Sequence, residues 1–309
     1  MSRNPSAPKI AFRGGAVHVR VPATSANLGP GYDALGLALG LYDDLVARIS
    51  EDGLDVDIAG EGEGMSRDES HLVIRSMRAA FDRLGGQPRG IELSCANRIP
   101  HGRGLGSSSA AIVAGILLAR ALVLGGDEIM PDEDVLALAG ELEGHPDNVA
   151  ATLFGGLTIA WTEKTGAHAL KRDVDPRVRV VVFIPPFESS THEARGLLPK
   201  SIAHGRAAFA AGRSALLVAA LAGAPEVLLP ATQDTLHQSY RAPAMPESAA
   251  LVAKLRKKSY AAVISGAGPT VLVLANGEGE VESIARLVPE GWRVLTPEID
   301  TEGGQILPL

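Results

Sequence analysis

Cysteine is nearly absent from this sequence, since Cys95 is the only one among 309 residues. A single cysteine allows no intrachain disulfide, so nothing in the chain demands an oxidising compartment. The first 21 residues contain no continuous apolar stretch, and we expect no signal peptide. The longest apolar run, residues 110–124, contains Arg120 and is shorter than a membrane-spanning helix, which favours a buried helix. These absences predict a soluble, cytoplasmic protein.

Blocks of positive charge are also missing. The chain has 29 Lys and Arg against 36 Asp and Glu, which gives a formal net charge of -7. A nucleic-acid partner held through its phosphates needs a basic block, so we expect neither nucleic acid nor a membrane as a partner. With 46% apolar residues and 35 glycines, the composition is that of a globular enzyme with room for two domains.

The spacing of apolar residues predicts a mixed α and β architecture that divides at a charged, irregular piece over 162–177. We expect domains at 1–165 and 166–309. In the first domain we expect strands at 16–21, 45–49, 54–58 and 90–94, helices at 70–84, 107–124 and 131–143, and a strand after Gly155-Gly156. In the second domain we expect strands at 178–184, 260–265, 270–275 and 292–296 and helices at 203–222, 247–257 and 280–287. That second order is βαββαβ, a ferredoxin-like arrangement with extra helices in its first crossover.

The stretch "PHGRGLGSSSAAIVAG", residues 100–115, is typical of a phosphate-binding loop but has no lysine. Its glycines allow close approach of a ligand, and the three serines can cap the helix that follows. The first turn of that helix leaves unpaired N–H groups with partial positive charge, which favour an anion. A glycine turn capped by serine for structural reasons alone is the alternative.

Three motifs together resemble the GHMP kinases. "GRGLGSSSAAIVAG" is similar to their ATP-binding motif, "VPATSANLGPGYDALGLAL" to their N-terminal motif and "SGAGPTVLVL" to their C-terminal glycine motif. The resemblance covers nearly the whole chain in the expected order. It implies an α+β, two-domain GHMP kinase fold, with an N-terminal ribosomal-protein-S5-like domain and a C-terminal ferredoxin-like βαββαβ domain. Many relatives dimerise, so a homodimer is a further expectation.

Four further segments point to one branch of this family. They are similar to segments of the members that phosphorylate the side-chain hydroxyl of L-homoserine with ATP. These segments are "LEGHPDNVAATLFGGL", "STHEARGLLP", "LHQSYRAPAMP" and the N-terminal motif in its form "SANLGPGYDALGLAL". A GHMP kinase acting on mevalonate or another isoprenoid precursor is the alternative of the same fold. A catalytically silent sensor that binds ATP and a metabolite is the alternative of another class.

The expected acceptor is a zwitterion, which needs cations for its carboxylate and an anion or carbonyl for its ammonium. Arg195 and Arg241 can hold the carboxylate through bidentate hydrogen bonds. Asp33 can hold the ammonium, with Asn27 beside it. Without the family motifs around them, the two arginines would be interpreted as solvated surface residues, and Asn27 and Asp33 as ordinary turn residues. By the resemblance, the substrate-binding set is Asn27, Asp33, His145, Asn148, Arg195 and Arg241.

The resemblance also implies a nucleotide and magnesium site. The family pairs a serine of the loop with a glutamate, for which Ser108 and Glu143 are our choices, with Ser107 or Ser109 and Glu141 as the alternatives. Adenine contacts are expected from His71, Val73 or Ser76. The predicted nucleotide-binding set is Pro100, His101, Gly102, Arg103, Gly104, Leu105, Gly106, Ser107, Ser108, Ser109, Ala110, Gly266 and Gly268.

Phosphoryl transfer proceeds through a loose transition state, so positioning and charge stabilisation supply most of the catalysis. The predicted catalytic residues are Arg195, Thr191 and Asp147. We expect Thr191 to donate a hydrogen bond to the acceptor or the γ-phosphate. Our hypothesis is that Asp147 is mainly structural and that magnesium, the helix N-terminus and Arg195 replace the missing lysine. The family form F-N-x-x-R departs here, because Ala210 stands where its Asn would be, while Arg213 is kept.

Overall fold

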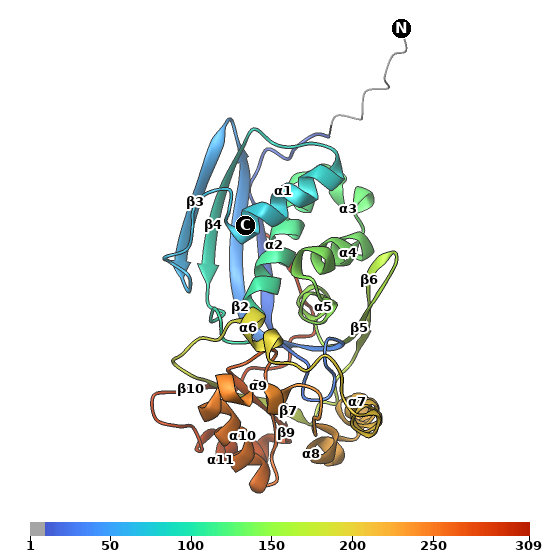
Figure 1. Ribbon diagram of the computed structural model, residues 1–309. Coiled ribbons are helices and arrows are strands. Elements are labelled where there is room, and N and C mark those ends of the chain that lie inside the picture. The colour runs from blue at the N-terminus through green and yellow to red at the C-terminus, as the bar shows by residue number, and fades with distance from the viewer. Residues whose placement is uncertain (1–9) are drawn as a thin grey trace.

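The computed structural model describes residues 10–309, apart from the side chains of Thr191 and His192. Two β-sheets lie one above the other in Figure 1, each with its own helices. This arrangement is the expected α+β, two-domain fold. The chain crosses from the larger sheet to the smaller one and returns its last strand to the larger.

The larger sheet has seven strands in the order β11-β1-β2-β4-β3, with β5 paired to β2 and β6 paired to β5. Strands β3 and β4 are parallel and the other pairs are antiparallel. Helices α1, α2, α4 and α5 cover one face of this sheet (Figure 1). The bounds are β1 Val17–Ala26, β2 Leu35–Ser50, β3 Gly53–Gly60, α1 Leu72–Leu84, β4 Gly90–Asn97, α2 Ser107–Leu122, α3 Gly126–Ile129, α4 Asp132–Glu143, α5 Pro146–Phe154, β5 Leu157–Glu163, β6 Gly166–Arg172 and β11 Gln305–Leu307.

The smaller sheet has four strands in the order β10-β7-β9-β8, and every pair is antiparallel. This strand order confirms the ferredoxin-like arrangement, because the two central strands are the first and the third of the domain. Helices α6 to α10 occupy the first crossover and α11 the second. The bounds are β7 Val178–Ile184, α6 Thr191–Gly196, α7 His204–Gly223, α8 Leu228–Ala231, α9 Gln238–Arg241, α10 Pro246–Lys257, β8 Ala261–Ile264, β9 Val271–Asn276, α11 Glu278–Ala285 and β10 Arg293–Leu295.

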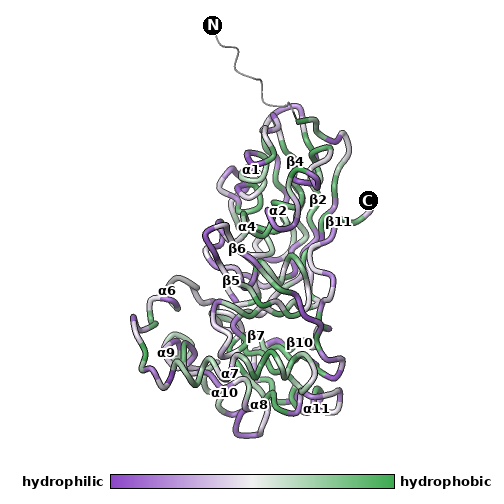
Figure 2. Tube along the Cα trace, turned by 90° about the vertical axis from the view of Figure 1, so that its right-hand side faces the viewer, coloured by the Kyte–Doolittle hydropathy of each residue, from purple (hydrophilic) through white to green (hydrophobic). Residues whose placement is uncertain are grey.

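One apolar core runs through both sheets. Val178, Val180 and Val182 on one face of β7 join the core of the larger sheet, whereas Val181 and Phe183 on the other face pack in a second cluster with residues of α10 and α11. This division follows from the alternation of side chains along a strand. In Figure 2, long stretches of the strands are accordingly green, the colour of hydrophobic residues. The shared core fixes the two sheets against each other.

Two expectations from the sequence need correction. The piece over 162–177 is not irregular throughout, because β5 and β6 form a hairpin whose partners run from Leu157↔Arg172 to Glu163↔Gly166. The expected boundary at 165/166 falls at the turn of this hairpin, and β11 also returns to the larger sheet. The "HPDN" segment forms the start of α5, where Pro146 takes the first helical position that suits proline.

Helix α7 is the one described helix that is long and apolar enough to cross a membrane. Only 22% of its most apolar 18-residue stretch is buried in the fold. A single helix of this kind is weak evidence, because helices of water-soluble proteins pass the same test. Helix α2, the apolar run that contains Arg120, is mostly buried between α1 and the sheet, as expected.

Close packing of α1 on α2 depends on a glycine. A Cβ at Gly115 would lie 2.5 Å from the backbone oxygen of Val73, whereas a Cβ at Gly212 of α7 would meet nothing within 4 Å. We expect Gly115→Ala to lower the free energy of unfolding by about 1–3 kcal/mol through overpacking. Gly212→Ala should raise it by about 0.5–1 kcal/mol, because alanine favours an exposed helix interior. Urea denaturation measures both, and an unchanged midpoint for Gly115→Ala would contradict the expectation.

Candidate active site

A cavity of about 290 Å³ lies where the two sheets meet. Its walls come from the β1–β2 loop, the glycine-rich loop before α2, the junction of α4 and α5, helices α6 and α9, and the β8–β9 turn. The fold therefore brings together residues that are more than 230 positions apart. The lining residues are Asn27, Asp33, Gly102, Gly104, Gly106, Ser107, Ser108, Glu143, His145, Asp147, Asn148, Ser189, Ser190, Arg195, Arg241, Gly266 and Ala267.

The glycine-rich loop presents a helix N-terminus to this cavity. Gly106 is the N-cap of α2 with φ of 73°, in the left-handed region that favours glycine. Within the described chain, the backbone N–H groups of Ser107, Ser108 and Ser109 donate no hydrogen bond. The expectation that serine caps the helix is thus wrong, since no side chain does so. Three free N–H groups at the positive end of a 16-residue helix suit an anion.

The loop is held by the β8–β9 turn of the other sheet. A Cβ at Gly104 would lie 2.4 Å from the backbone oxygen of Ser265 and 2.7 Å from that of Gly268. The Ser265 hydroxyl donates to the Gly104 oxygen at 2.6 Å. The glycine turn therefore packs against the phosphate loop, and only glycine fits at this contact.

Glu143 contacts two of the three serines. Its Oε1 accepts hydrogen bonds from Ser108 Oγ at 2.7 Å and Ser109 Oγ at 2.9 Å. The alternative carboxylate, Glu141, instead pairs with Arg83 on the surface at 2.7 Å. Hydroxyl and carboxylate oxygens at the mouth of a phosphate loop are the ligands that Mg²⁺ takes, together with phosphate and water oxygens. Among the described residues, no cluster of three His, Cys, Asp or Glu side chains forms a complete metal cage.

The start of α5 holds three polar residues in one arrangement. Asp147 is 1% exposed, and its Oδ1 meets His145 Nδ1 at 2.7 Å and accepts from the Asn148 backbone N–H at 2.8 Å. Burial disfavours protonation of His145, but the hydrogen bond and charge of Asp147 outweigh it and raise the pKa of His145. Thr24 donates to Asn148 Oδ1 at 2.8 Å, which leaves the Asn148 amide donors for the cavity.

Two predicted substrate residues bind each other in this structure. Arg195 donates to both oxygens of Asp33, at 2.7 and 3.0 Å, and to the Tyr32 hydroxyl at 3.0 Å. The hydrogen bonds that Asp33 accepts from it raise the pKa of Arg195. Asp33 has a φ of 54° and Asn27 a φ of 65°, and left-handed conformations of this kind in non-glycine residues cluster at functional sites.

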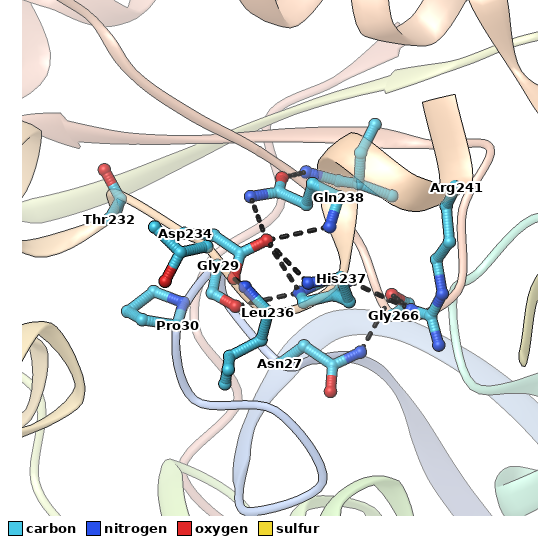
Figure 3. A network of polar contacts seen from close by, with 12 residues as sticks. Asn27, Gly29, Pro30, Thr232, Asp234, Leu236, His237, Gln238, Arg241 and Gly266 are labelled. Atoms are coloured by element: carbon cyan, nitrogen blue, oxygen red, sulfur yellow. Dashed lines mark hydrogen bonds and ion pairs between the residues drawn. The ribbon is translucent and has the colours of Figure 1, made fainter. Parts of the chain in front are cut away.

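Arg241 is a buried cation without an acid to neutralise it. Its side chain is 1% exposed and donates to Gly266 O at 3.2 Å and His237 Nδ1 at 3.1 Å (Figure 3). It also donates to Ala194 O at 3.3 Å. None of these partners carries a negative charge, and burial lowers the pKa of Arg241. Within the described chain, no carboxylate lies within ion-pair distance of this guanidinium. A buried charge of this kind is costly unless something pairs with it, so the residue is suited to an anionic ligand.

A second, more apolar cavity of about 240 Å³ adjoins the first at Ser107 and Ser108. His71, Val73 and His101 line it, and the buried His71 Nδ1 has no hydrogen-bond partner in the described structure. Ser76, the third adenine candidate, is instead fully buried and donates to Leu72 O.

Some predicted residues lie outside both cavities. Leu105 and Ala110 are core residues, and Arg103 binds the backbone oxygens of Pro185 and Pro186. Pro100, Ser109 and Gly268 are buried and line neither cavity. The Thr191 side chain is outside the described residues, so its role stays a prediction. Ala210 is buried in α7 beside the β1–β2 loop and does not line the cavity.

Sequence reasoning missed residues that hold or line the site: Thr24, Tyr32, Ser189, Ser190 and His237. Each lies inside or beside a motif that the sequence makes visible. Their types are too common in loops for the sequence to single them out, because only the folded contacts give them a role.

Two family models match the chain, the GHMP kinases N terminal domain over residues 71–156 and the GHMP kinases C terminal over residues 216–294. The homoserine kinase of Streptomyces avermitilis is 61% identical over 97% of this chain and 98% of its own length. The homoserine kinase of Streptomyces coelicolor is 59% identical over 97% of both.

Solved structures are also similar to this chain over nearly its whole length. The crystal structure of homoserine kinase from Cytophaga hutchinsonii has a TM-score of 0.81 at 26% identity and covers 96% of this chain and 98% of that one. A mevalonate kinase from L. major in complex with R-mevalonate has a TM-score of 0.64 at 14% identity, with 94% of this chain and 98% of that one covered. At that identity the second likeness is one of fold alone.

Proposed function

Because the chain belongs to the GHMP kinase family and to its homoserine kinase branch, we propose that it transfers the γ-phosphoryl group of ATP to the side-chain hydroxyl of L-homoserine. The product is O-phospho-L-homoserine, a precursor in threonine biosynthesis. The observation that carries the proposal is the placement of Arg241, a buried guanidinium without an acid, in the same cavity as a carboxylate and a helix N-terminus.

The acceptor end of the cavity suits an α-amino acid. Arg241 and Arg195 supply cations for a carboxylate, and Asp33 supplies an anion for an ammonium. Asn27 and Asn148 add neutral polar groups, with the Asn27 amide held by its hydrogen bond to Gly266 O at 2.8 Å. Mevalonate carries a carboxylate but no ammonium, so Asp33 favours the amino acid over the isoprenoid precursor.

The nucleotide end combines the two cavities. The N–H groups at the start of α2 can hold the phosphates, while the apolar cavity beside His71 and Val73 can take the adenine. The two cavities share Ser107 and Ser108, which supports a binding mode with the phosphates between the base and the acceptor. An intact serine tract and Glu143 also favour an active kinase over a silent sensor.

Ser108 and Glu143 would hold the magnesium ion. When bound, the ion neutralises the negative charge of the transferring phosphate. The chain itself supplies Arg195 and the α2 N-terminus as further positive groups around the same space. These groups account for a phosphate loop that has no lysine.

Asp147 acts in this proposal by positioning. Its Oδ1 is engaged by His145 and by the Asn148 N–H, and the residue is buried under them. Asp147 thereby fixes the two side chains that face the acceptor. A cytoplasmic location and a homodimer stay predictions.

A coupled ADP-release assay over L-homoserine, L-serine, L-threonine and mevalonate tests the substrate. We expect L-homoserine to give the highest kcat/KM, because it alone has both charged groups and a hydroxyl at the required reach. Omission of magnesium should abolish turnover. Turnover of mevalonate without turnover of L-homoserine would refute the proposal.

Glu143→Gln tests the magnesium site, and Glu141→Gln is its matched control. We expect Glu143→Gln to lower kcat by on the order of 100-fold and to raise the magnesium concentration needed for half-maximal rate. Glu141 pairs with Arg83 on the surface, so its variant should behave as the wild type. Equal effects of the two substitutions would exclude Glu143 as the ligand.

Asp147→Asn separates positioning from base catalysis. We expect kcat to stay within about tenfold of the wild type, whereas loss of a general base costs about 10²–10⁴-fold. The pKa of His145, followed by NMR, should fall because the charge that raises it is gone.

The pair of His145 and Asp147 also makes the stability of the fold depend on pH. The pKa of His145 is higher in the folded than in the unfolded protein, so the pair stabilises the fold fully at pH values below the unfolded pKa. This stabilisation is lost as the pH rises through the folded pKa. Asp147→Asn should therefore cost more stability in mildly acidic than in alkaline solution. Asp175→Asn, which removes a surface partner of Arg177, is the control and should leave the His145 titration unchanged.

A further inference from the structure

His237 is a fully buried histidine directly before α9, and neither the cavity lining nor the reaction accounts for it. Its exposure is 0%, and both ring nitrogens are hydrogen-bonded. Nε2 lies 2.8 Å from Gly29 O and Nδ1 lies 3.1 Å from Arg241 Nη1 (Figure 3). The ring thus joins the β1–β2 loop to the buried guanidinium.

The two partners fix the chemical state of the ring. A carbonyl oxygen such as Gly29 O can only accept, so Nε2 carries the proton. A guanidinium can only donate, so Nδ1 must be unprotonated to accept from Arg241. His237 is therefore the neutral imidazole with its proton on Nε2. Burial, which lowers the pKa of His237, acts in the same direction.

The ring connects the two halves of the amino-acid site. Gly29 belongs to the loop that carries Asn27 and Asp33, while Arg241 faces the cavity from α9. Gly266 O gives a second connection, because it accepts from Asn27 Nδ2 at 2.8 Å and from Arg241 Nη1 at 3.2 Å (Figure 3). The distance between the cationic and the anionic groups is thus set by two short bridges.

Asp234 holds the histidine itself in place. Its Oδ2 accepts from the backbone N–H groups of His237 and Gln238, at 3.2 and 2.8 Å, and lies 3.7 Å from His237 Nε2. The Tyr32 ring packs at 5.4 Å from the imidazole and at 5.5 Å from the Arg241 guanidinium carbon. The histidine and the arginine therefore have little freedom to move independently.

We propose that His237 is a positioning residue for amino-acid recognition, whose unprotonated Nδ1 orients the Arg241 guanidinium toward the substrate carboxylate. The inference rests on the proposed homoserine kinase function and deepens it. It explains how a buried cation without an acidic partner keeps one orientation before substrate binds. Because Gly29 O takes the other nitrogen, the orientation of Arg241 is tied to the loop that recognises the ammonium.

Two amide substitutions separate the two bonds of the ring. In His237→Asn, the shorter side chain can place an oxygen near the former Nδ1 and still accept from Arg241, but it cannot reach Gly29 O. In His237→Gln, the longer side chain can reach Gly29 O but leaves Arg241 Nη1 without this acceptor. Both variants remove the ring, so each serves as the packing control of the other.

We expect His237→Gln to raise the KM for L-homoserine at least tenfold, with kcat and the KM for ATP changed less than threefold. His237→Asn should stay within about threefold of the wild type in all three, which is rescue by the variant that keeps the acceptor. Equal KM values for the two variants, or a loss confined to kcat and thermal stability, would overturn the inference. Absence of L-homoserine turnover in the wild type would instead refute the proposed function.

A measurement on the unmodified protein covers the case in which a variant fails to fold. In ¹⁵N-histidine-labelled wild type, the His237 ring should show a protonated Nε2 and an unprotonated, hydrogen-bonded Nδ1 at neutral pH. A proton on Nδ1, in either the other tautomer or the imidazolium, would overturn the inference, because Arg241 could then find no acceptor there.

Discussion

The contact between two glycine-rich segments holds the whole site together. Gly104 of the phosphate loop lies against Ser265 and Gly268 of the β8–β9 turn so closely that a methyl group would collide with backbone oxygens. Further hydrogen bonds cross at the same place, from the Thr270 N–H to Arg103 O and from the Gly266 N–H to Ala26 O. Because the first segment belongs to the larger sheet and the second to the smaller, this contact joins the two domains at the cavity. The N-terminus of α2 and the side chains of Asp33, Arg195 and Arg241 therefore line the same cavity.

Charge is distributed unevenly around that junction. Arg195 has Asp33 as a partner, whereas the buried Arg241 has only neutral acceptors. The difference is chemically useful, since a substrate carboxylate can satisfy Arg241 without competition from an internal acid. Glu143 and the serines lie next to the helix N-terminus in the same cavity. The cavity therefore contains a helix N-terminus with a carboxylate beside it and, in Arg241, a buried cation whose hydrogen-bond partners are neutral.

Periodicity and glycine placement predicted most of the elements but not all of their limits. The βαββαβ order of the second domain is visible in the sequence because its strands are short apolar runs between clear turns. Strand β6 was not predicted, since its last residues, Leu170, Lys171 and Arg172, are largely solvent-exposed in the β5–β6 hairpin and have no apolar alternation. The role of β11 could not be predicted either, because three residues at the end of the chain pair with β1, nearly 290 positions away.

The family, the phosphate loop and the residue types of the site can be predicted from local motifs, because the spacing of these motifs is chemically specific. The fold determines which charges meet. It paired Asp33 with Arg195, assigned Glu143 rather than Glu141 to the serines, and enclosed Arg241 with His237. The physical reason is that pairing and burial depend on contacts between segments far apart in the chain. The geometry of those contacts is set by the shared core and not by any local pattern.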